Sequence, residues 1–326
     1  MSDTTATDEG QEQVLQDVII LGGGPAGFAA GIYAGRGRLK TLVLDGMGGG
    51  GQLNTIDTIE NFPGQLEAIT GPDLVDKMRQ QMEKFGTEIT FDQAEKVTVD
   101  DDAQAITVEG AYGKYRGRTL LLASGARHRH LNVPGEEKLQ GRGVSYCATC
   151  DGAFFKGQRV AVVGGGDTAV KEAVYLSRVV DHVTVIHRRD QLRAEKVIQE
   201  KALASENIDF LWDSVVESIE GEDAVTGLKI RNVKTEEKSE LTVTGVFVFV
   251  GILPNTDIVK GLVNLDPSAF VVVDADMRTS HPRIFAAGDV RSGSVRQIAS
   301  AVGDGTTAIL NIQEHLDSET PPREQS

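Results

Sequence analysis

The chain has 326 residues, a length that allows two domains or one domain interrupted by another. Of these residues 40% are hydrophobic and 25% are charged, which is ordinary for a soluble globular protein. Its formal net charge of −15 argues against nucleic acid or an anionic membrane as a partner, since both would repel it. The first 13 residues lack the basic start and apolar stretch of a signal peptide, and no apolar run reaches the roughly 18 residues of a membrane span. We therefore expect a cytoplasmic protein.

The first predicted unit is a strand, a glycine-rich turn, a helix and a second strand. The runs 16–21 and 41–44 are apolar and suit buried parallel strands, and 28–38 has the composition of a tightly packed helix. The turn matches the G-x-G-x-x-G pattern with Gly22, Gly24, Pro25, Ala26 and Gly27. This pattern brings backbone N–H groups and a helix N-terminus to a pyrophosphate, and Asp45, after the second strand, is placed to bind a ribose.

The chain has only two cysteines, Cys147 and Cys150, and they form a C-x-x-C motif. In such a pair the first thiol can attack a disulfide and the second can resolve the product. Asp151 follows directly and could carry a proton to or from a thiolate, although it could also cap a helix. The rival interpretations of the pair are a zinc site, with His128 and His130 as the nearest further ligands, and a structural disulfide.

The strand–turn–helix–strand pattern recurs after the cysteines. The runs 159–163 and 182–186 predict strands, and 168–180 predicts the helix between them. The second turn fits G-x-G-x-x-A, and its candidate contacts are Gly164, Gly166, Asp167, Thr168 and Ala169. It is therefore a second dinucleotide-binding pattern in its expected context.

The two units differ at the end of their second strands. Asp45 follows Gly27 by 18 positions, and the same spacing from Ala169 reaches a basic stretch. That stretch contains His187, Arg188, Arg189 and Arg193. A carboxylate would repel a 2′-phosphate, whereas guanidinium groups bind it bidentately. The first unit therefore predicts FAD or NAD and the second NADPH, with a solvated basic face as the alternative for the arginines.

The last third of the chain carries a further candidate site. The run 284–287 predicts a strand, Gly288 and Asp289 stand at its end, and 296–310 has helical spacing. Asp289 could bond the ribityl chain of a flavin, or it could cap a helix. A helix N-terminus near Arg296 and Gln297 could stabilise negative charge on a reduced flavin.

In combination these motifs resemble those of low-molecular-weight thioredoxin reductases, in order from about residue 17 to residue 316. The matching stretches are GGGPAGFAAGIYAGR, GGQLNTIDTIENFPG, CATCDGAFFKG, GGGDTAVKEA, HRRDQLRAEK and IFAAGDVRSGSVRQ. The resemblance implies an α/β fold with two Rossmann-like dinucleotide-binding domains. Residues 1–125 and 251–326 would form the FAD domain, and 126–250 the inserted NADPH domain. It also implies Gln52 and Asn61 as flavin contacts, although either could be a turn residue.

By the same resemblance, Cys150 would accept electrons from FAD, Cys147 would attack the protein substrate, and Asp151 would act as acid and base. The inserted domain would rotate on linkers near Gly125 and Gly251. The implied function is NADPH-dependent reduction of thioredoxin or a thioredoxin-like protein by a homodimer.

Other functions remain open on the same residues. Related enzymes oxidise dithiols with oxygen or take electrons from ferredoxin, but the second glycine turn and its arginines would then have no use. A nucleotide sensor and a zinc-stapled binding module are further alternatives. An apolar groove that includes Ala153, Phe154 and Phe155 is expected to receive the partner, with core packing as the alternative for these side chains.

Overall fold

The computed structural model describes residues 14–46, 48–56 and 58–319, so the first 13 residues, on which the expected location depends, lie outside it. The described chain forms two compact units. The first unit combines the described residues up to 54 with 71–126 and those from 254 onwards, and the second combines 55–70 with 127–253. The segment 55–70, which we expected with the first domain, closes on itself through an antiparallel bridge between Ile59 and Ile69 and contributes no strand to the first sheet.

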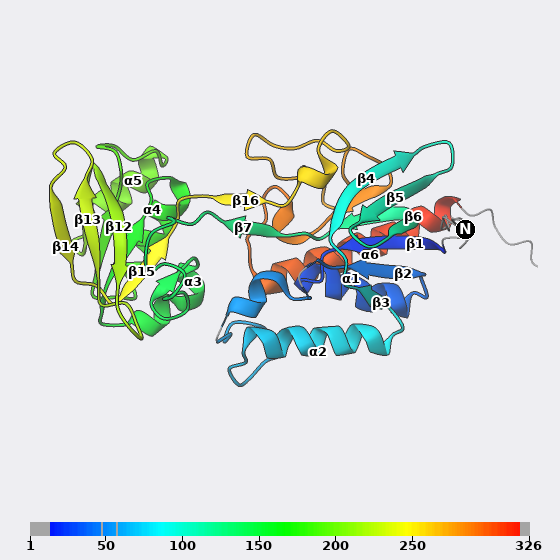
Figure 1. The fold of residues 1–326 in the computed structure, drawn as a ribbon, viewed down its shortest axis with the longest axis horizontal. Coiled ribbons are helices and arrows are strands. Elements are labelled where there is room, and N and C mark those ends of the chain that lie inside the picture. The colour runs from blue at the N-terminus through cyan, green and yellow to red at the C-terminus, as the bar shows by residue number, and fades with distance from the viewer. Residues whose placement is uncertain (1–13, 47, 57, 320–326) are drawn as a thin grey trace, which may run out of the picture. The chain divides into compact units, whose positions relative to one another are not determined.

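A seven-stranded sheet forms the centre of the first unit (Figure 1). Its strands are β1 (Leu15–Leu21), β2 (Thr41–Leu44), β3 (Glu88–Thr90), β4 (Ala94–Asp100), β5 (Ala105–Gly110), β6 (Lys114–Leu122) and β17 (Ile284–Ala286). The order is β3-β2-β1-β6-β5-β4, with β17 also on β6. Strands β1, β2, β3, β6 and β17 pair in parallel, while β4 and β5 add antiparallel pairs. Val18, Ile19 and Ile20 of β1 are fully buried, as a central parallel strand requires.

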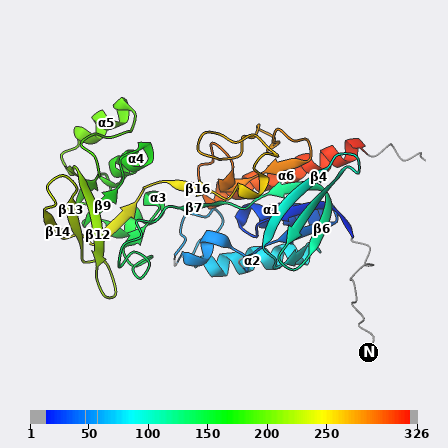
Figure 2. The ribbon, with the colours of Figure 1, turned by 45° about the horizontal axis from the view of Figure 1, so that its top comes forward.

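Small residues allow the helices of the first unit to approach one another closely. Its helices are α1 (Pro25–Arg36), α2 (Gly71–Lys84) and α6 (Ile298–Glu319), with the 3-10 turns η1 (Gly51–Thr55), η3 (Asp257–Val259) and η4 (Gly288–Val290). Helices α1 and α6 lie side by side (Figures 1 and 2). A Cβ on Gly305 of α6 would stand 2.1 Å from the carbonyl oxygen of Ala26 on α1, so only glycine fits there. Helix α6 starts two residues later than predicted and continues to Glu319.

The second unit contains a five-stranded parallel sheet and a three-stranded antiparallel sheet. The parallel sheet has the order β11-β10-β9-β15-β8, built from β8 (Val144–Ser145), β9 (Arg159–Val163), β10 (His182–Ile186), β11 (Ile208–Leu211) and β15 (Gly245–Val248). The other sheet is β12 (Ser214–Glu220), β13 (Gly227–Asn232) and β14 (Lys238–Leu241). The helices are α3 (Ala148–Asp151), η2 (Gly152–Phe155), α4 (Asp167–Leu176) and α5 (Lys196–Leu203). Strands β9 and β10 have the predicted bounds.

Helix α4 ends earlier than the predicted 168–180. It stops at Leu176, and Ser177 is its C-cap residue. The side-chain amide of Asn207 donates to the carbonyl of Ser177 at 2.7 Å, which satisfies a carbonyl that the helix leaves free. The apolar residues that follow are covered by other elements: Val180 is buried and bridges Lys156. The helix end is therefore set by a residue 30 positions away.

Two short strands carry the chain from one unit to the other. Strand β7 (Ala126–His128) pairs with β16 (Ile252–Pro254). The glycines next to them have left-handed backbone conformations, with φ of +67° at Gly125 and +129° at Gly251. These are the positions expected to serve as hinges, and the rotation itself stays a prediction. Within residues 14–46, 48–56 and 58–319, no helix combines the length and the apolar character needed to cross a membrane.

Candidate functional site

The first glycine turn leaves no room for side chains where the backbone must close, and open space where a ligand would approach. Gly22 has φ of +112°, and a Cβ there would stand 2.4 Å from the carbonyl oxygen of Ala123. A Cβ on Gly27 would stand 1.9 Å from the carbonyl oxygen of Gly22. In contrast, nothing lies within 4 Å of a Cβ on Gly24, which begins α1 without a side-chain cap. The arrangement fits a phosphate bound by backbone N–H groups at a helix N-terminus.

Asp45 follows β2 and lies against this turn. Its side chain is buried, and a Cβ on Gly23 would stand 2.7 Å from Oδ2 of Asp45. The loop beyond Asp45 returns to the turn, because the N–H of Gly50 donates to the carbonyl of Gly23 at 2.6 Å. The structure therefore places the predicted ribose-binding carboxylate beside the predicted pyrophosphate turn.

The second glycine turn repeats this geometry in the second unit. Gly164 has φ of +149°, and a Cβ there would stand 2.5 Å from the carbonyl oxygen of Phe249. Nothing lies within 4 Å of a Cβ on Gly166, which begins α4 without a side-chain cap. A Cβ on Gly165 would stand 2.3 Å from the ring of His187, just as Gly23 meets Asp45. The residues of the second turn therefore also fit a dinucleotide.

The basic residues gather around the open side of the second turn. Burial lowers the pKa of His187; a backbone hydrogen bond involving Gln191 opposes this shift, and the charges of Arg193, Arg189 and Arg188 add to it. The imidazole is only 4% exposed, and its Nε2 has no hydrogen-bond partner. All three arginines are exposed to solvent. They supply a positive field at the site where the first unit has a carboxylate.

Two further contacts hold the arginine loop on the turn. The N–H of Arg193 donates to the carbonyl of Gly165 at 2.7 Å. Oδ1 of Asp167 accepts the N–H of Glu195 at 2.7 Å, so this predicted cofactor contact has a role within the protein itself. Thr168 is exposed in the first turn of α4, and Ala169 is buried beneath it. These contacts anchor the backbone of the arginine loop on the turn, while the arginine side chains themselves are exposed.

The candidate flavin residues near the end of the chain come together with the first glycine turn. Gly288, with φ of +79°, places η4 against α1, because a Cβ there would stand 3.1 Å from Cβ of Ala26. Asp289 lies inside η4, where burial raises its pKa and Ser294 donates to its Oδ1 at 3.2 Å. The side chain of Asp289 therefore bonds Ser294 and does not cap η4, whereas the alternative interpretation predicted a helix cap.

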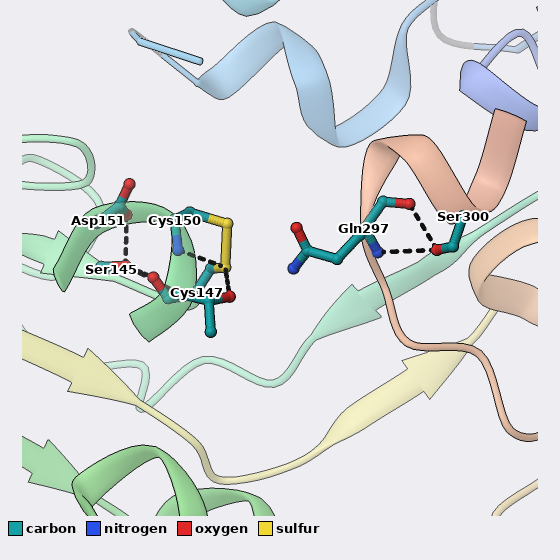
Figure 3. Close-up of a disulfide and its surroundings, with 7 residues drawn as sticks. Ser145, Cys147, Cys150, Asp151, Gln297 and Ser300 are labelled. Carbon is teal, nitrogen blue, oxygen red and sulfur yellow. Dashed lines mark hydrogen bonds between the residues drawn. A yellow bond between two sulfur atoms is a disulfide. The ribbon is translucent and has the colours of Figure 1, made fainter. Parts of the chain in front are cut away.

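The chain then turns into α6 through an unusual backbone conformation. Arg296 has φ of +56°, and its guanidinium lies over the ring of Phe270 at 5.1 Å. Gln297 comes next, and its N–H and C=O both bond the hydroxyl of Ser300, as Figure 3 shows. Arg296 and Gln297 therefore stand at the start of α6, where the helix dipole is positive.

The two remaining flavin candidates are placed differently. Gln52 lies in the first unit and donates its side-chain amide to the carbonyl of Ala126. Asn61 belongs to the segment 55–70, which is part of the second unit. Both assignments stay predictions.

Cys147 and Cys150 are joined as a disulfide at the start of α3 (Figure 3). Cys147 is the N-cap residue of this helix, and its Sγ accepts the N–H of Cys150 at 3.2 Å. The hydroxyl of Ser145 donates to Oδ2 of Asp151 at 2.5 Å and accepts the N–H of Cys147 at 3.1 Å. Asp151 makes no side-chain cap to η2. The carboxyl group is thus two hydrogen bonds away from the backbone of Cys147.

Tyr146, the residue before Cys147, is held by side chains that no sequence motif marks. The hydroxyl of Tyr146 donates to Oε1 of Glu136 at 2.9 Å and lies 2.7 Å from Nδ1 of His130. His128 stacks on the same phenol ring at a centroid distance of 5.1 Å. Glu136 is 3% exposed, and burial together with this carboxylate raises the pKa of Tyr146. No local pattern marks these residues, because the contacts join positions 10 to 18 apart.

The expected partner-binding side chains have different environments. Phe155 packs on the ring of Phe247 with the centroids 5.4 Å apart, as the core-packing alternative predicted. Ala153 is exposed, and Phe154 is 49% exposed. The structure therefore leaves Ala153 and Phe154 as candidates for contact with a partner.

The chain is similar to known proteins over most of its length. Residues 16–305 match the family described as pyridine nucleotide-disulphide oxidoreductase. The chain is 45% identical over 305 residues to the thioredoxin reductase of Streptomyces coelicolor, which covers 93% of this chain and 94% of the relative. It is 46% identical over 308 residues to the thioredoxin reductase of Listeria monocytogenes, covering 94% and 95%. The solved structure of thioredoxin reductase from Streptococcus pyogenes is similar at a TM-score of 0.89 and 45% identity, covering 94% of this chain and 100% of that one.

Proposed function

This chain belongs to the thioredoxin reductases of the pyridine nucleotide-disulphide oxidoreductase family, and on that premise we propose that it transfers electrons from NADPH, through FAD, to the disulfide of a thioredoxin. The observation that carries the proposal is the Cys147–Cys150 disulfide in a unit that also contains the basic glycine turn. A redox pair and a site suited to NADPH then belong to one chain that has a second dinucleotide turn for FAD.

The first unit contains the residues that would hold FAD. The open N-terminus of α1 at Gly24 suits the pyrophosphate, Asp45 the ribose, and Asp289 the ribityl chain. FAD, when bound, supplies two-electron transfer between a nicotinamide and a disulfide. The N-terminus of α6, beyond Arg296 and Gln297, would stabilise negative charge in that site.

The second unit contains the residues that would select NADPH over NADH. Arg188 and Arg189 are exposed beside His187, where their guanidinium groups are available to a 2′-phosphate. NADH lacks that phosphate and would leave these charges in water. The selectivity should therefore arise from the arginines, while the turn at Gly166 would bind the part common to both nucleotides.

The two cysteines would then perform disulfide exchange with the protein substrate. Two electrons and two protons convert the Cys147–Cys150 disulfide into two thiols. As a thiolate, Sγ of Cys147 attacks one sulfur of the substrate disulfide; that S–S bond breaks, and a mixed disulfide forms with release of a substrate thiolate. Sγ of Cys150, deprotonated, then attacks Sγ of Cys147, restores the intramolecular disulfide and releases the second substrate thiolate.

The residues around the two cysteines support these separate roles for Cys147 and Cys150. The N–H of Cys150 donates to Sγ of Cys147, and such a donor stabilises a thiolate more than a thiol. Asp151, held by Ser145, is the carboxyl group nearest in sequence to supply and remove the protons. Ala153 and Phe154 are exposed close behind the pair in sequence and are proposed contacts for the protein substrate.

An anaerobic titration of the purified protein tests the proposal, with the flavin absorbance as the readout. NADPH should bleach the flavin at near-stoichiometric amounts, NADH should require a large excess, and oxidised thioredoxin should restore the absorbance. The Cys147→Ser variant should still be bleached by NADPH but should not be reoxidised by thioredoxin. A flavin that ignores NADPH, yet is bleached by dithiols or reduced ferredoxin, would move the protein to the dithiol-oxidase or ferredoxin-dependent class.

The homodimer and the cytoplasmic location stay predictions. Size-exclusion chromatography with light scattering would give the number of chains per particle. The identity of the thioredoxin partner would follow from trapping a mixed disulfide with the Cys150→Ser variant, because that variant lacks the resolving thiol.

A further inference from the structure

A buried ion pair lies directly beneath the turn that carries Asp289. Arg291 donates from Nε to Oδ2 of Asp304 at 2.6 Å and from Nη2 to Oδ1 at 2.9 Å. Oδ2 of Asp304 also accepts the N–H of Gly288 at 3.1 Å. Asp304 is 7% exposed, so its charge depends on these donors. One carboxylate thus binds the residue before Asp289 and the second residue after it.

The position of this carboxylate is fixed by the packing of α6. Asp304 precedes Gly305, which lies so close to α1 that a Cβ would stand 2.1 Å from the carbonyl oxygen of Ala26. Gly288 meets Ala26 as well, at 3.1 Å from a built Cβ. Helix α6 and η4 therefore both pack closely against α1 at Ala26. Through Asp304, the ion pair joins the turn at Gly288 to this closely packed helix.

The pair also sets the charge around Asp289. Burial is the largest cause that raises the pKa of Asp289; the charge of Asp304 also raises this pKa, and the charge of Arg291 lowers it. Ser294 donates to Asp289 from the other side and accepts the N–H of Arg296. Asp289 is thus held between a clamped turn and the loop that leads into α6.

We propose that Arg291 and Asp304 are positioning residues for the flavin site, which hold Asp289 in the orientation that binds the ribityl chain. The inference rests on the FAD site of the proposed function and goes beyond it, since neither residue is expected to touch the flavin. It predicts that loss of the pair weakens FAD binding out of proportion to its effect on folding.

The experiment compares this pair with a matched one at the other end of the same helix. Arg283 is 7% exposed and bonds the carboxylate of Glu319 at the C-terminal end of α6. The variants are Arg291→Met, Arg291→Lys, Asp304→Asn and the control Arg283→Met. For each, the Kd of the apoprotein for FAD is measured by flavin fluorescence, and the unfolding temperature of the apoprotein is measured separately.

Arg291→Met and Asp304→Asn should weaken FAD binding at least about tenfold, as loss of charged hydrogen bonds implies. Arg291→Lys should fold and still lose several-fold in affinity, because lysine cannot make the bidentate contact. Arg283→Met should lower the unfolding temperature and leave the Kd for FAD within about twofold of wild type.

Unchanged FAD affinity in Arg291→Lys, or an equal loss of affinity in Arg283→Met, would overturn the inference and leave the proposed function intact. A wild-type protein that takes up no FAD would overturn both. The two failures are therefore distinguishable in one set of measurements.

Discussion

The two glycine turns of this chain have the same backbone geometry and opposite electrostatics. Both helices begin at a glycine with open space and no side-chain cap, and both turns receive a hydrogen bond from the loop after the second strand. The two turns differ in the side chain that packs on the second glycine of the turn, which is Gly23 in the first unit and Gly165 in the second. That side chain is the carboxylate Asp45 in the first unit and the imidazole His187, surrounded by arginines, in the second.

Under the proposed function, this difference would let one fold element serve two nucleotides. The backbone would then bind the pyrophosphate in both units, because N–H groups and a helix N-terminus are common to both turns. The residues after the second strand would select the ribose, since a carboxylate favours hydroxyl groups and guanidinium groups favour a phosphate. Substitutions at the turn should therefore affect stability, and substitutions at the strand end should affect nucleotide choice.

The largest effect on stability is expected at the last residue of the glycine pattern, which is Gly27 in the first turn and Ala169 in the second. Gly27→Ala would place a Cβ 1.9 Å from the carbonyl oxygen of Gly22 and should cost about 3 kcal/mol of stability, with loss of bound flavin. The matched change Ala169→Gly should cost only about 1 kcal/mol, the helix-propensity difference. Denaturant unfolding with flavin content measures both. Equal stability of Gly27→Ala and wild type would show that the first turn can relax.

The next largest effect is expected from the arginines. The double variant Arg188→Ala/Arg189→Ala should raise the KM for NADPH about 100-fold, equivalent to ~2.7 kcal/mol, and leave NADH nearly unchanged. Steady-state kinetics with both nucleotides measures this. Equal losses with NADPH and NADH would contradict the electrostatic difference between the two turns.

A smaller effect is expected from Asp167, the first residue of α4. The first turn has Pro25 at this position and holds its loop without such a side chain, whereas Oδ1 of Asp167 accepts the N–H of Glu195. Asp167→Ala should loosen the arginine loop and raise the KM for NADPH about fivefold, near 1 kcal/mol. The KM for NADH serves as the control. A fivefold rise there too would show that Asp167 acts on the shared part of the nucleotide.

The smallest effect concerns the pH dependence of stability at His187. Its folded-state pKa lies below the ordinary 6.5, so the unfolded chain binds more protons as the pH falls below 6.5. His187 therefore lowers the stability of the folded protein in acid, and at higher pH this contribution vanishes. Between pH 7 and pH 5, the unfolding temperature of the His187→Asn variant should fall by less than that of the wild-type protein. Parallel curves for the two proteins would exclude a titrating His187.

The sequence alone predicted both strand–turn–helix–strand units and the opposite side chains, Asp45 and His187, that lie against their glycine turns. Strands β2, β9 and β10 have the bounds predicted from their apolar runs, because a buried parallel strand needs a continuous apolar segment. The equal spacing from Gly27 to Asp45 and from Ala169 to His187 placed equivalent side chains on equivalent glycines. Steric limits at these glycines and the length of one βαβ unit are local properties, which is why the sequence was sufficient.

Only the tertiary structure decided the contacts between residues far apart in the chain. The end of α4 depends on Asn207, the support of Asp289 on Asp304, and the anchoring of Tyr146 on Glu136. None of these partners is marked by periodicity or by a motif. Each contact forms because strands and helices bring distant residues together and because a buried polar group must find a partner, a condition that only the complete fold can satisfy.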